Sequence, residues 1–263
     1  MSSPLYQFCP PDRIDILEKN LIRLSPTNDF NDPFDGNPHL TPFNPNRVLT
    51  QAEFDSLRKV VLRHEPGMSD EDIHKKLKTV KRTPESDKQG IEQMRILMAE
   101  MGVLCLTKNF TGEDSLLMWA HYAYKHMGFA IEFNTGSPFF AKEWNRYDLT
   151  RSPCDVVYQN ERPSLAAGQI LDWSTELFFT KSKEWFYETE VRLLIEFKDA
   201  AVPDLKLFYI PAESFKRVIL GLKSPPALAE RLRKLRERPD YRNLVVEQVV
   251  LDEREYKLHT CPV

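Results

Sequence analysis

Two glutamates and an arginine occupy alternate positions within one short segment, Glu188 to Arg192. Alternate side chains of a β-strand share a face, so Glu188, Glu190 and Arg192 would face one way and the apolar residues of 191–195 the other. The two carboxylates would lie roughly 6.5–7 Å apart. That is close enough for each to change the other's proton affinity and to flank one sugar-sized group. A solvated strand with an Arg–Glu ion pair is the plainer alternative, and the spacing alone favours it.

A predicted helix over residues 115–127 supplies the next set of chemical groups, with Asp114 as its N-terminal cap. His121 and His126 are five positions apart and therefore point in different directions, unlike the two histidines of a zinc-binding HExxH helix. The helix thus gives little indication of a metal site. We expect His121 or Tyr122 to orient a neighbouring loop, and we count both among the catalytic candidates.

A loop over residues 28–36 is dense in Asn, Asp, Pro and Gly, which bond their own backbone or favour turns. Asn31 and Asp32 could contact a ribose or phosphate, or could only brace this loop. Ser25 and Lys181 are equally open, because single hydroxyls and amines are usually structural or exposed. The sequence lacks a P-loop and the GxGxxG and GxSxG motifs, so the chemistries of those motifs are not expected.

The composition indicates a globular protein without a dominant charge. Of the 263 residues, 41% are hydrophobic and 29% charged, and the net charge is −3, which gives no general attraction to phosphate backbones. The basic run over residues 231–238 is more often a solvated helix face than a nucleic-acid footprint. The four cysteines have no CxxC spacing, so we expect reduced thiols and no bound metal. No apolar stretch approaches the ~18 residues needed to span a bilayer, and no secretion signal opens the sequence, so we expect a soluble, cytoplasmic protein without a membrane partner.

The pattern of elements predicts an α+β fold with a mixed, mostly antiparallel sheet core in a single domain, residues 1–263. We expect strands near residues 5–8, 21–25, 103–107, 129–133, 155–158, 187–197, 205–210, 217–222, 245–251 and 255–260. Helices are expected at 12–20, 115–127, within 165–181 and between the strands at 222 and 245. Residues 50–101 form a helical insertion that starts at a capping box, Thr50 to Glu53.

Several motifs together resemble an uncharacterised bacterial family, a domain of unknown function. Its members are similar to this chain in a Leu-Tyr opening at Leu5-Tyr6 and in an FNDPFD loop at Phe30 to Asp35. They also share an LMWxHYAxxHxGxxIEF segment, here Leu117 to Phe133, and a KSxxWxxExEwRL segment, here Lys181 to Leu193. The motifs are spread over most of the chain and are specific when taken together.

The order of elements also distantly resembles the ADP-ribosyltransferase fold. This resemblance implies that Glu190 bonds the nicotinamide ribose and stabilises the oxocarbenium-like state, while Glu188 readies the acceptor. It further implies an NAD-binding role for residues near the opening strand and the 115–127 helix, where aromatic rings could stack on nicotinamide. Gln7 stands where many transferases carry histidine, and it can still bond a ribose hydroxyl. The expected NAD-binding residues are Tyr6, Gln7, Ser25, Asn31, Asp32, Trp119 and Arg192.

The leading hypothesis is therefore an NAD-dependent ADP-ribosyltransferase-like enzyme or NAD glycohydrolase, such as a toxin or antiviral-defence effector, acting on a protein or nucleic acid. A second hypothesis is a nucleic-acid enzyme or binding protein in which Glu188, Glu190 and Asp32 hold a divalent cation and the basic run binds phosphates. The third is a non-catalytic interaction module that binds its partner through the insertion.

Overall fold

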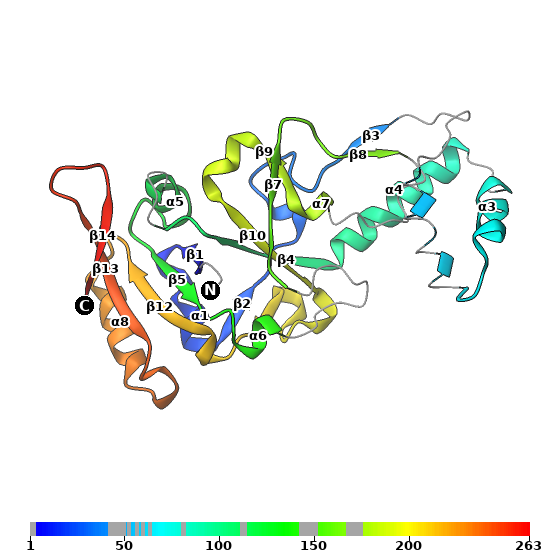
Figure 1. The fold of residues 1–263 in the computed structure, drawn as a ribbon. Coiled ribbons are helices and arrows are strands. Elements are labelled where there is room, and N and C mark those ends of the chain that lie inside the picture. Colours follow the sequence, from blue (N-terminus) through cyan, green and yellow to red (C-terminus); the bar gives the residue numbers. More distant parts are fainter. Residues whose placement is uncertain are drawn as a thin grey trace.

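The computed structural model describes residues 4–41, 65–79, 83–110, 115–141, 152–166 and 176–263, with 51, 54–55, 58 and 61–62. Its centre is a sheet of eight strands in the order β14-β13-β12-β5-β1-β4-β10-β6. All neighbours in this sheet are antiparallel except β12 and β13 (Figure 1). The eight strands are β1 (Leu5–Cys9), β4 (Met101–Thr107), β5 (Phe129–Phe133), β6 (Cys154–Asp155), β10 (Glu190–Glu196), β12 (Phe215–Leu220), β13 (Val245–Leu251) and β14 (Leu258–Pro262). The predicted α+β class with a mixed, mostly antiparallel sheet is confirmed.

Three two-stranded sheets flank the main one. They pair β2 (Leu21–Arg23) with β11 (Leu207–Tyr209), β3 (His39–Thr41) with β8 (Ser164–Ala166), and β7 (Val157–Gln159) with β9 (Thr180–Ser182). The α-helices are α1 (Asp15–Lys19), α3 (Asp70–Thr79), α4 (Pro84–Ala99), α5 (Ser115–Tyr122), α6 (Pro138–Ala141), α7 (Glu176–Phe179) and α8 (Pro226–Arg236). The 3-10 helices are η1 (Pro11–Ile14), η2 (Thr27–Asp29), η3 (Lys183–Glu188), η4 (Phe197–Asp199), η5 (Pro203–Leu205), η6 (Ala212–Ser214) and η7 (Pro239–Tyr241).

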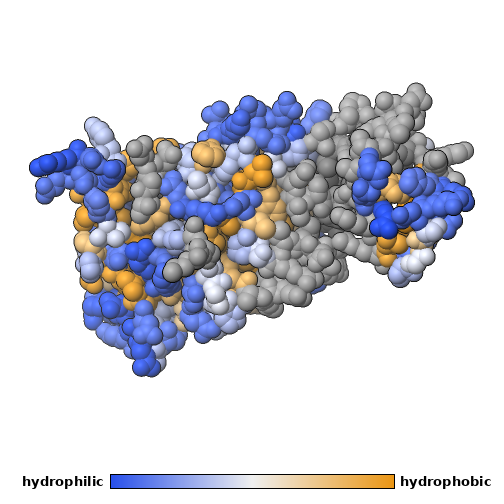
Figure 2. All heavy atoms as spheres, viewed as in Figure 1, coloured by the Kyte–Doolittle hydropathy of each residue, from blue (hydrophilic) through white to orange (hydrophobic). Residues whose placement is uncertain are grey.

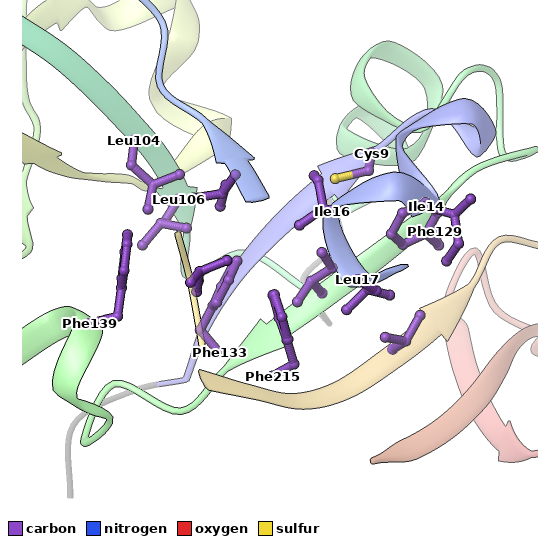
Figure 3. Close-up of a cluster of buried hydrophobic side chains, with 14 of the residues drawn as sticks. Cys9, Ile14, Ile16, Leu17, Leu104, Leu106, Phe129, Phe133, Phe139 and Phe215 are labelled. Carbon is purple, nitrogen blue, oxygen red and sulfur yellow. The ribbon is translucent and has the colours of Figure 1, made fainter. Parts of the chain in front are cut away.

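Apolar side chains cover both faces of the main sheet, because strand residues alternate between the faces. On β1, Leu5 and Cys9 belong to the largest core cluster, whereas Tyr6 and Phe8 pack with Trp119 on the other face. Figure 3 shows part of the largest cluster, where side chains of α1 and α6 meet those of β4 and β5. The helix α5 therefore lies on the opposite face from α1, and that opposite face carries the polar residues described below.

The helical elements of the predicted insertion lie at one end of the molecule, where α3 and α4 are drawn in cyan and green-cyan (Figure 1). Helix α4 ends at Ala99, and β4 follows it directly from Met101. The two residues of the predicted capping box, Thr50 and Glu53, lie outside the described residues, as does the predicted cap Asp114. On the visible face of the molecule, hydrophilic residues cover α3 and the upper rim of the molecule. Hydrophobic residues occupy smaller areas between them (Figure 2). Among the described residues, no helix combines the length and the apolar character that a bilayer crossing requires.

Two element boundaries differ from the prediction in ways that affect the polar face. Helix α5 ends at Tyr122 rather than Met127, because Tyr124, Lys125 and His126 all adopt left-handed backbone angles, with φ of 47°, 55° and 69°. The expected strand over 187–197 starts only at Glu190, after a left-handed residue, Thr189, that ends η3. Both turns break regular periodicity within a few residues.

Candidate active site

A cavity of about 420 Å³ opens on the polar face of β1, β4 and β10, between α5, the loop that follows η2, and η3. Its volume falls in the range of small-molecule sites, roughly 300–1,000 Å³. All the predicted site residues line it except Asp32 and Trp119: Tyr6, Gln7, Ser25, Asn31, His121, Tyr122, Glu188, Glu190 and Arg192. The fold therefore gathers side chains from distant parts of the chain around one hollow.

Arg192 forms the buried base of this cavity, with only 1% of its side chain exposed. Its Nε and Nη2 donate to the two oxygens of Glu190 at 2.7 and 2.8 Å. Its Nη1 and Nη2 donate to the two oxygens of Asp35 at 2.9 and 2.6 Å, and Nη1 also donates to the Phe178 carbonyl at 2.7 Å. Each of its five N–H groups thus has an acceptor, and the guanidinium fixes Asp35 and Glu190 in one plane.

Lys181 joins the two glutamates of the Glu-x-Glu motif. Its ammonium donates to Glu188 at 2.6 Å and to Glu190 at 3.2 Å, and it lies 3.8 Å from Asp35. Trp185 lies beneath it, with the ammonium 4.9 Å from the ring centroid. Burial acts to lower the pKa of Lys181, but the two glutamates outweigh burial and raise it, so this lysine stays charged.

The cluster formed by Asp35, Lys181, Glu188, Glu190 and Arg192 therefore contains three carboxylates and two cations. With every group ionised it carries one net negative charge. This buried charge faces the cavity, so the cavity floor attracts a positively charged group more strongly than an anionic one.

Glu188 and Glu190 differ in their partners and consequently in their proton affinity. Burial acts to raise the pKa of Glu190, but Arg192 and Lys181 outweigh burial and lower it to about 2. Burial likewise raises the pKa of Glu188, and here Lys181 and the Tyr122 hydroxyl offset the rise only in part. The pair therefore combines a carboxylate that is ionised at neutral pH with one whose pKa is raised, a division typical of acid–base sites.

Glu188 reaches Glu190 by a turn and not by strand alternation, which corrects the geometry expected from the sequence. Glu188 is the last residue of η3, and Thr189 follows it with φ of 40°. The Thr107 hydroxyl donates to the Glu188 carbonyl, and the Tyr158 hydroxyl accepts a 2.7 Å bond from the Glu190 amide. These bonds hold the turn so that both carboxylates meet Lys181. The alternation expected from Glu190 onward is confirmed, since Val191, Leu193 and Ile195 belong to the core of the opposite face.

Side chains from two other elements complete the wall beside Glu188. The Tyr122 hydroxyl donates to Glu188 Oε1, and Asn31 Nδ2 donates to the Tyr122 oxygen at 3.2 Å. His121 is exposed at the cavity, with its Nδ1 3.0 Å from the Tyr187 hydroxyl. Glu188 is thus linked to the predicted loop through Tyr122, and His121 to η3 through Tyr187.

Two predicted residues, Trp119 and Asp32, do not line this cavity, and two that line it, Tyr6 and Gln7, have side chains that pack elsewhere. Trp119 is fully buried, in edge contact with Phe8, and does not line the cavity. The Tyr6 ring is stacked on Phe110 with centroids 4.7 Å apart, and is 4% exposed. Hydrophobic packing of these rings explains their burial.

Gln7 and Asp32 are the other two of these residues. Gln7 alternates with Tyr6 along β1, and its register partner Ile131 belongs to the core cluster of the other face, so its side chain points away from the Tyr6 side. Asp32 lines a different cavity, described below. Ser25 lies at the rim, where its backbone pairs with Val103 of β4.

The sequence did not single out Asp35, and left Lys181 undecided, although both belong to the cluster. A buried strand arginine requires a carboxylate partner, but the residue spacing alone favoured a solvated Arg192, so the sequence offered no signal for Asp35. The FNDPFD motif offered two aspartates as that partner, and the structure selects the second. Tyr187, which contacts His121, carried no signal in the sequence.

The arrangement gives the metal-dependent alternative little support. Asp32 is separated from Glu188 and Glu190, whose oxygens are already bonded to cations. Within the described ranges no three His, Cys, Asp or Glu side chains are placed to share an ion. In the basic run, Arg231, Arg233 and Arg238 pair with Glu18, Glu230 and Asp240.

The part of the chain that carries most of this cluster also matches a family model. No curated protein and no solved structure matches the chain. The match includes Tyr122, Lys181, Glu188, Glu190 and Arg192, but not the loop that supplies Asp35. The ADP-ribosyltransferase resemblance finds no support in these comparisons and stays a prediction. The resemblance to an uncharacterised family is confirmed, since residues 118–193 match the model of the family described as "Protein of unknown function (DUF2971)".

Proposed function

We propose that the cavity is the active site of an enzyme that cleaves the bond between nicotinamide and ribose in NAD, as an ADP-ribosyltransferase or NAD glycohydrolase. The observation that carries this proposal is the pairing of two unlike carboxylates, Glu188 and Glu190, on one lysine at the base of a ligand-sized cavity. The net negative charge of the cluster favours the positively charged nicotinamide ring of NAD over a neutral one.

In this proposal Glu190 stabilises the transition state. The C1′–N bond breaks with its electron pair moving to the ring nitrogen, so nicotinamide leaves as a neutral molecule and positive charge develops on the ribose. A carboxylate already fixed beside the ribose lowers this barrier, because it needs no reorganisation when the charge appears. Arg192 and Lys181 keep Glu190 ionised and immobile, which is the state that this role requires.

Glu188 acts as the general base for the acceptor in the same scheme. An acceptor hydroxyl or amine attacks C1′ and loses a proton, which Glu188 takes. Proton transfer is most efficient when the pKa of the base lies near the working pH, and burial raises the pKa of Glu188 in that direction. Tyr122 and Lys181 hold its two oxygens and set the orientation of the carboxylate.

The test is to incubate the protein with NAD and to measure free nicotinamide, with and without cell extract as a source of acceptor. We expect Glu190→Gln to reduce nicotinamide release by about 100-fold or more. Glu188→Gln should reduce transfer to the acceptor by about 100-fold and slow hydrolysis less.

Glu196→Gln is the matched control, because Glu196 is also a buried β10 carboxylate with a lysine partner, Lys198, but does not line the cavity. It should retain the wild-type rate. Absence of nicotinamide release by the wild type under both conditions would remove NAD cleavage as the function.

A further inference from the structure

A second cavity, of about 350 Å³, lies on the other side of the 27–38 loop from the candidate active site. The loop forms one wall, and the last residues of α4, Met98 and Ala99, form the other. Phe30 and Asp35 line both cavities. The second cavity is thus a separate hollow that shares part of its wall with the first.

Asp32 is the charged group that this second cavity leaves incompletely bonded. Its residue is 4% exposed, and its Oδ1 accepts a 2.9 Å bond from the Phe34 amide, which closes a turn. Its Oδ2 is buried and has no hydrogen-bond partner within the described part of the chain. A buried carboxylate oxygen without a partner is costly, and a donor supplied by a ligand would remove that cost.

The surroundings of Asp32 favour a cation. Asp35 already has both oxygens bonded to Arg192, so Asp32 is the lining carboxylate with a free acceptor. The last turn of the 16-residue helix α4 lines the same hollow, and the carbonyl groups at the carboxyl end of a helix carry partial negative charge. Arg95 also lines the cavity, but its side chain is 68% exposed and lies 3.9 Å from Glu92. A carboxylate with an unbonded oxygen and the last turn of a helix therefore both border this hollow.

We propose that the second cavity binds a primary ammonium group, with Asp32 as its counter-ion. An ammonium has three N–H donors, and the side chains of Thr27, Asn28 and Asn37 that line the hollow offer oxygen acceptors besides Asp32. A divalent metal ion is less suited, since such ions usually take several carboxylates, and among the described lining residues Asp32 alone has a carboxylate oxygen without a partner. The ammonium could belong to a small diamine or to a lysine side chain of a partner polypeptide.

The test is isothermal titration of the full chain, without NAD, using three probes: putrescine, its uncharged isostere 1,4-butanediol, and a short peptide containing one lysine. We expect saturable binding of an amine probe and none of butanediol. Preference for putrescine assigns the site to small amines, and preference for the peptide assigns it to a lysine side chain. Because NAD is absent, the result does not depend on the proposed function of the first cavity.

Asp32→Asn removes the charge while keeping an oxygen that can accept from the Phe34 amide, so the turn is retained. We expect it to weaken amine binding by about tenfold or more, the effect of losing a hydrogen bond to a charged group. Asp252→Asn is the matched control, because Asp252 also caps a turn, over Arg254 and Glu255, far from this loop in the sequence. Equal binding of butanediol and putrescine, equal binding by Asp32→Asn and wild type, or no saturable binding of any amine would each overturn the proposal.

Discussion

Arg192 makes a quantitative prediction about stability possible. Replacing it by methionine removes the five hydrogen bonds that it donates, and leaves Asp35 and Glu190 buried without their main partner. Breaking a buried ion pair by removing one partner costs about 3–5 kcal/mol. Lys181 remains 3.2 Å from Glu190 and 3.8 Å from Asp35 and keeps part of the compensation, so we expect the lower end, about 3 kcal/mol.

The measurement is urea unfolding at pH 7, followed by tryptophan fluorescence, with thermal unfolding as a second readout. A loss of about 3 kcal/mol should lower the melting temperature by roughly 6–12 °C in a chain of this size. Arg192→Lys should recover only part of the lost stability. An ammonium cannot reproduce the paired, planar hydrogen bonds that the guanidinium donates to each of the two carboxylates, Asp35 and Glu190.

Arg231 provides the matched control for this prediction. It also makes two hydrogen bonds to one carboxylate, with Nε and Nη2 donating to Glu18 at 2.8 and 2.6 Å. Its side chain, however, is 45% exposed. Exposed pairs usually contribute less than about 1 kcal/mol, so Arg231→Met should cost little. Equal losses for Arg192→Met and Arg231→Met would show that burial does not set the cost, and would refute the reasoning.

Three further predictions concern individual groups. Tyr122→Phe removes the hydroxyl that donates to Glu188, so the pKa of Glu188 should rise and the acidic limb of the pH–rate profile should move to higher pH. Gly128→Ala would place a Cβ 2.0 Å from a backbone carbonyl oxygen, so chemical denaturation should show a loss of about 3 kcal/mol or more. Gly136→Ala should cost little, because its Cβ would lie 3.4 Å from the nearest atom, the side-chain oxygen of Asn134. The pKa of Glu190 is lowered to about 2 in the folded protein, below the value of about 4.3 in the unfolded chain. The ionised Glu190 therefore stabilises the fold fully above about pH 4.3, and this stabilisation is lost as the pH falls toward 2. The stability of Glu190→Gln, followed by acid titration, should lack this loss.

The sheet was largely predictable because its signals are local. Alternation of apolar and polar residues gave β10 its two faces, and β5 has the predicted bounds, Phe129–Phe133. Boundaries were missed where the backbone turns left-handed without glycine, as at Thr189 and at Tyr124 to His126. Such residues are uncommon in that conformation, so composition gives no warning of them. The burial of α5 against the sheet, and the backbone hydrogen bonds of the turn that follows it, compensate for the conformational free energy of the left-handed residues Tyr124 to His126.

The cluster around Lys181 was less predictable because its members meet only through the tertiary fold. Asp35 and Arg192 are 157 positions apart in the sequence, yet they share two hydrogen bonds. Lys181 is placed by the parallel pairing of β9 with β7, a contact that no short motif specifies. The sequence therefore identified the Glu-x-Glu-x-Arg segment, but could not indicate which cation the two glutamates share.

The buried cluster is better explained by chemistry than by stability. Replacing a buried ion pair by well-packed apolar residues is often neutral or stabilising, so a fold gains little by burying five charged groups. The arrangement does create two carboxylates of unlike proton affinity, one ionised and one shifted toward neutral pH, within reach of a single cavity. Arg192 maintains this difference because it bonds Glu190 and not Glu188, whereas Lys181 bonds both carboxylates and lowers the pKa of each. The cation that bonds one member of the pair, more than the Glu-x-Glu spacing itself, therefore separates the proton affinities of the two glutamates.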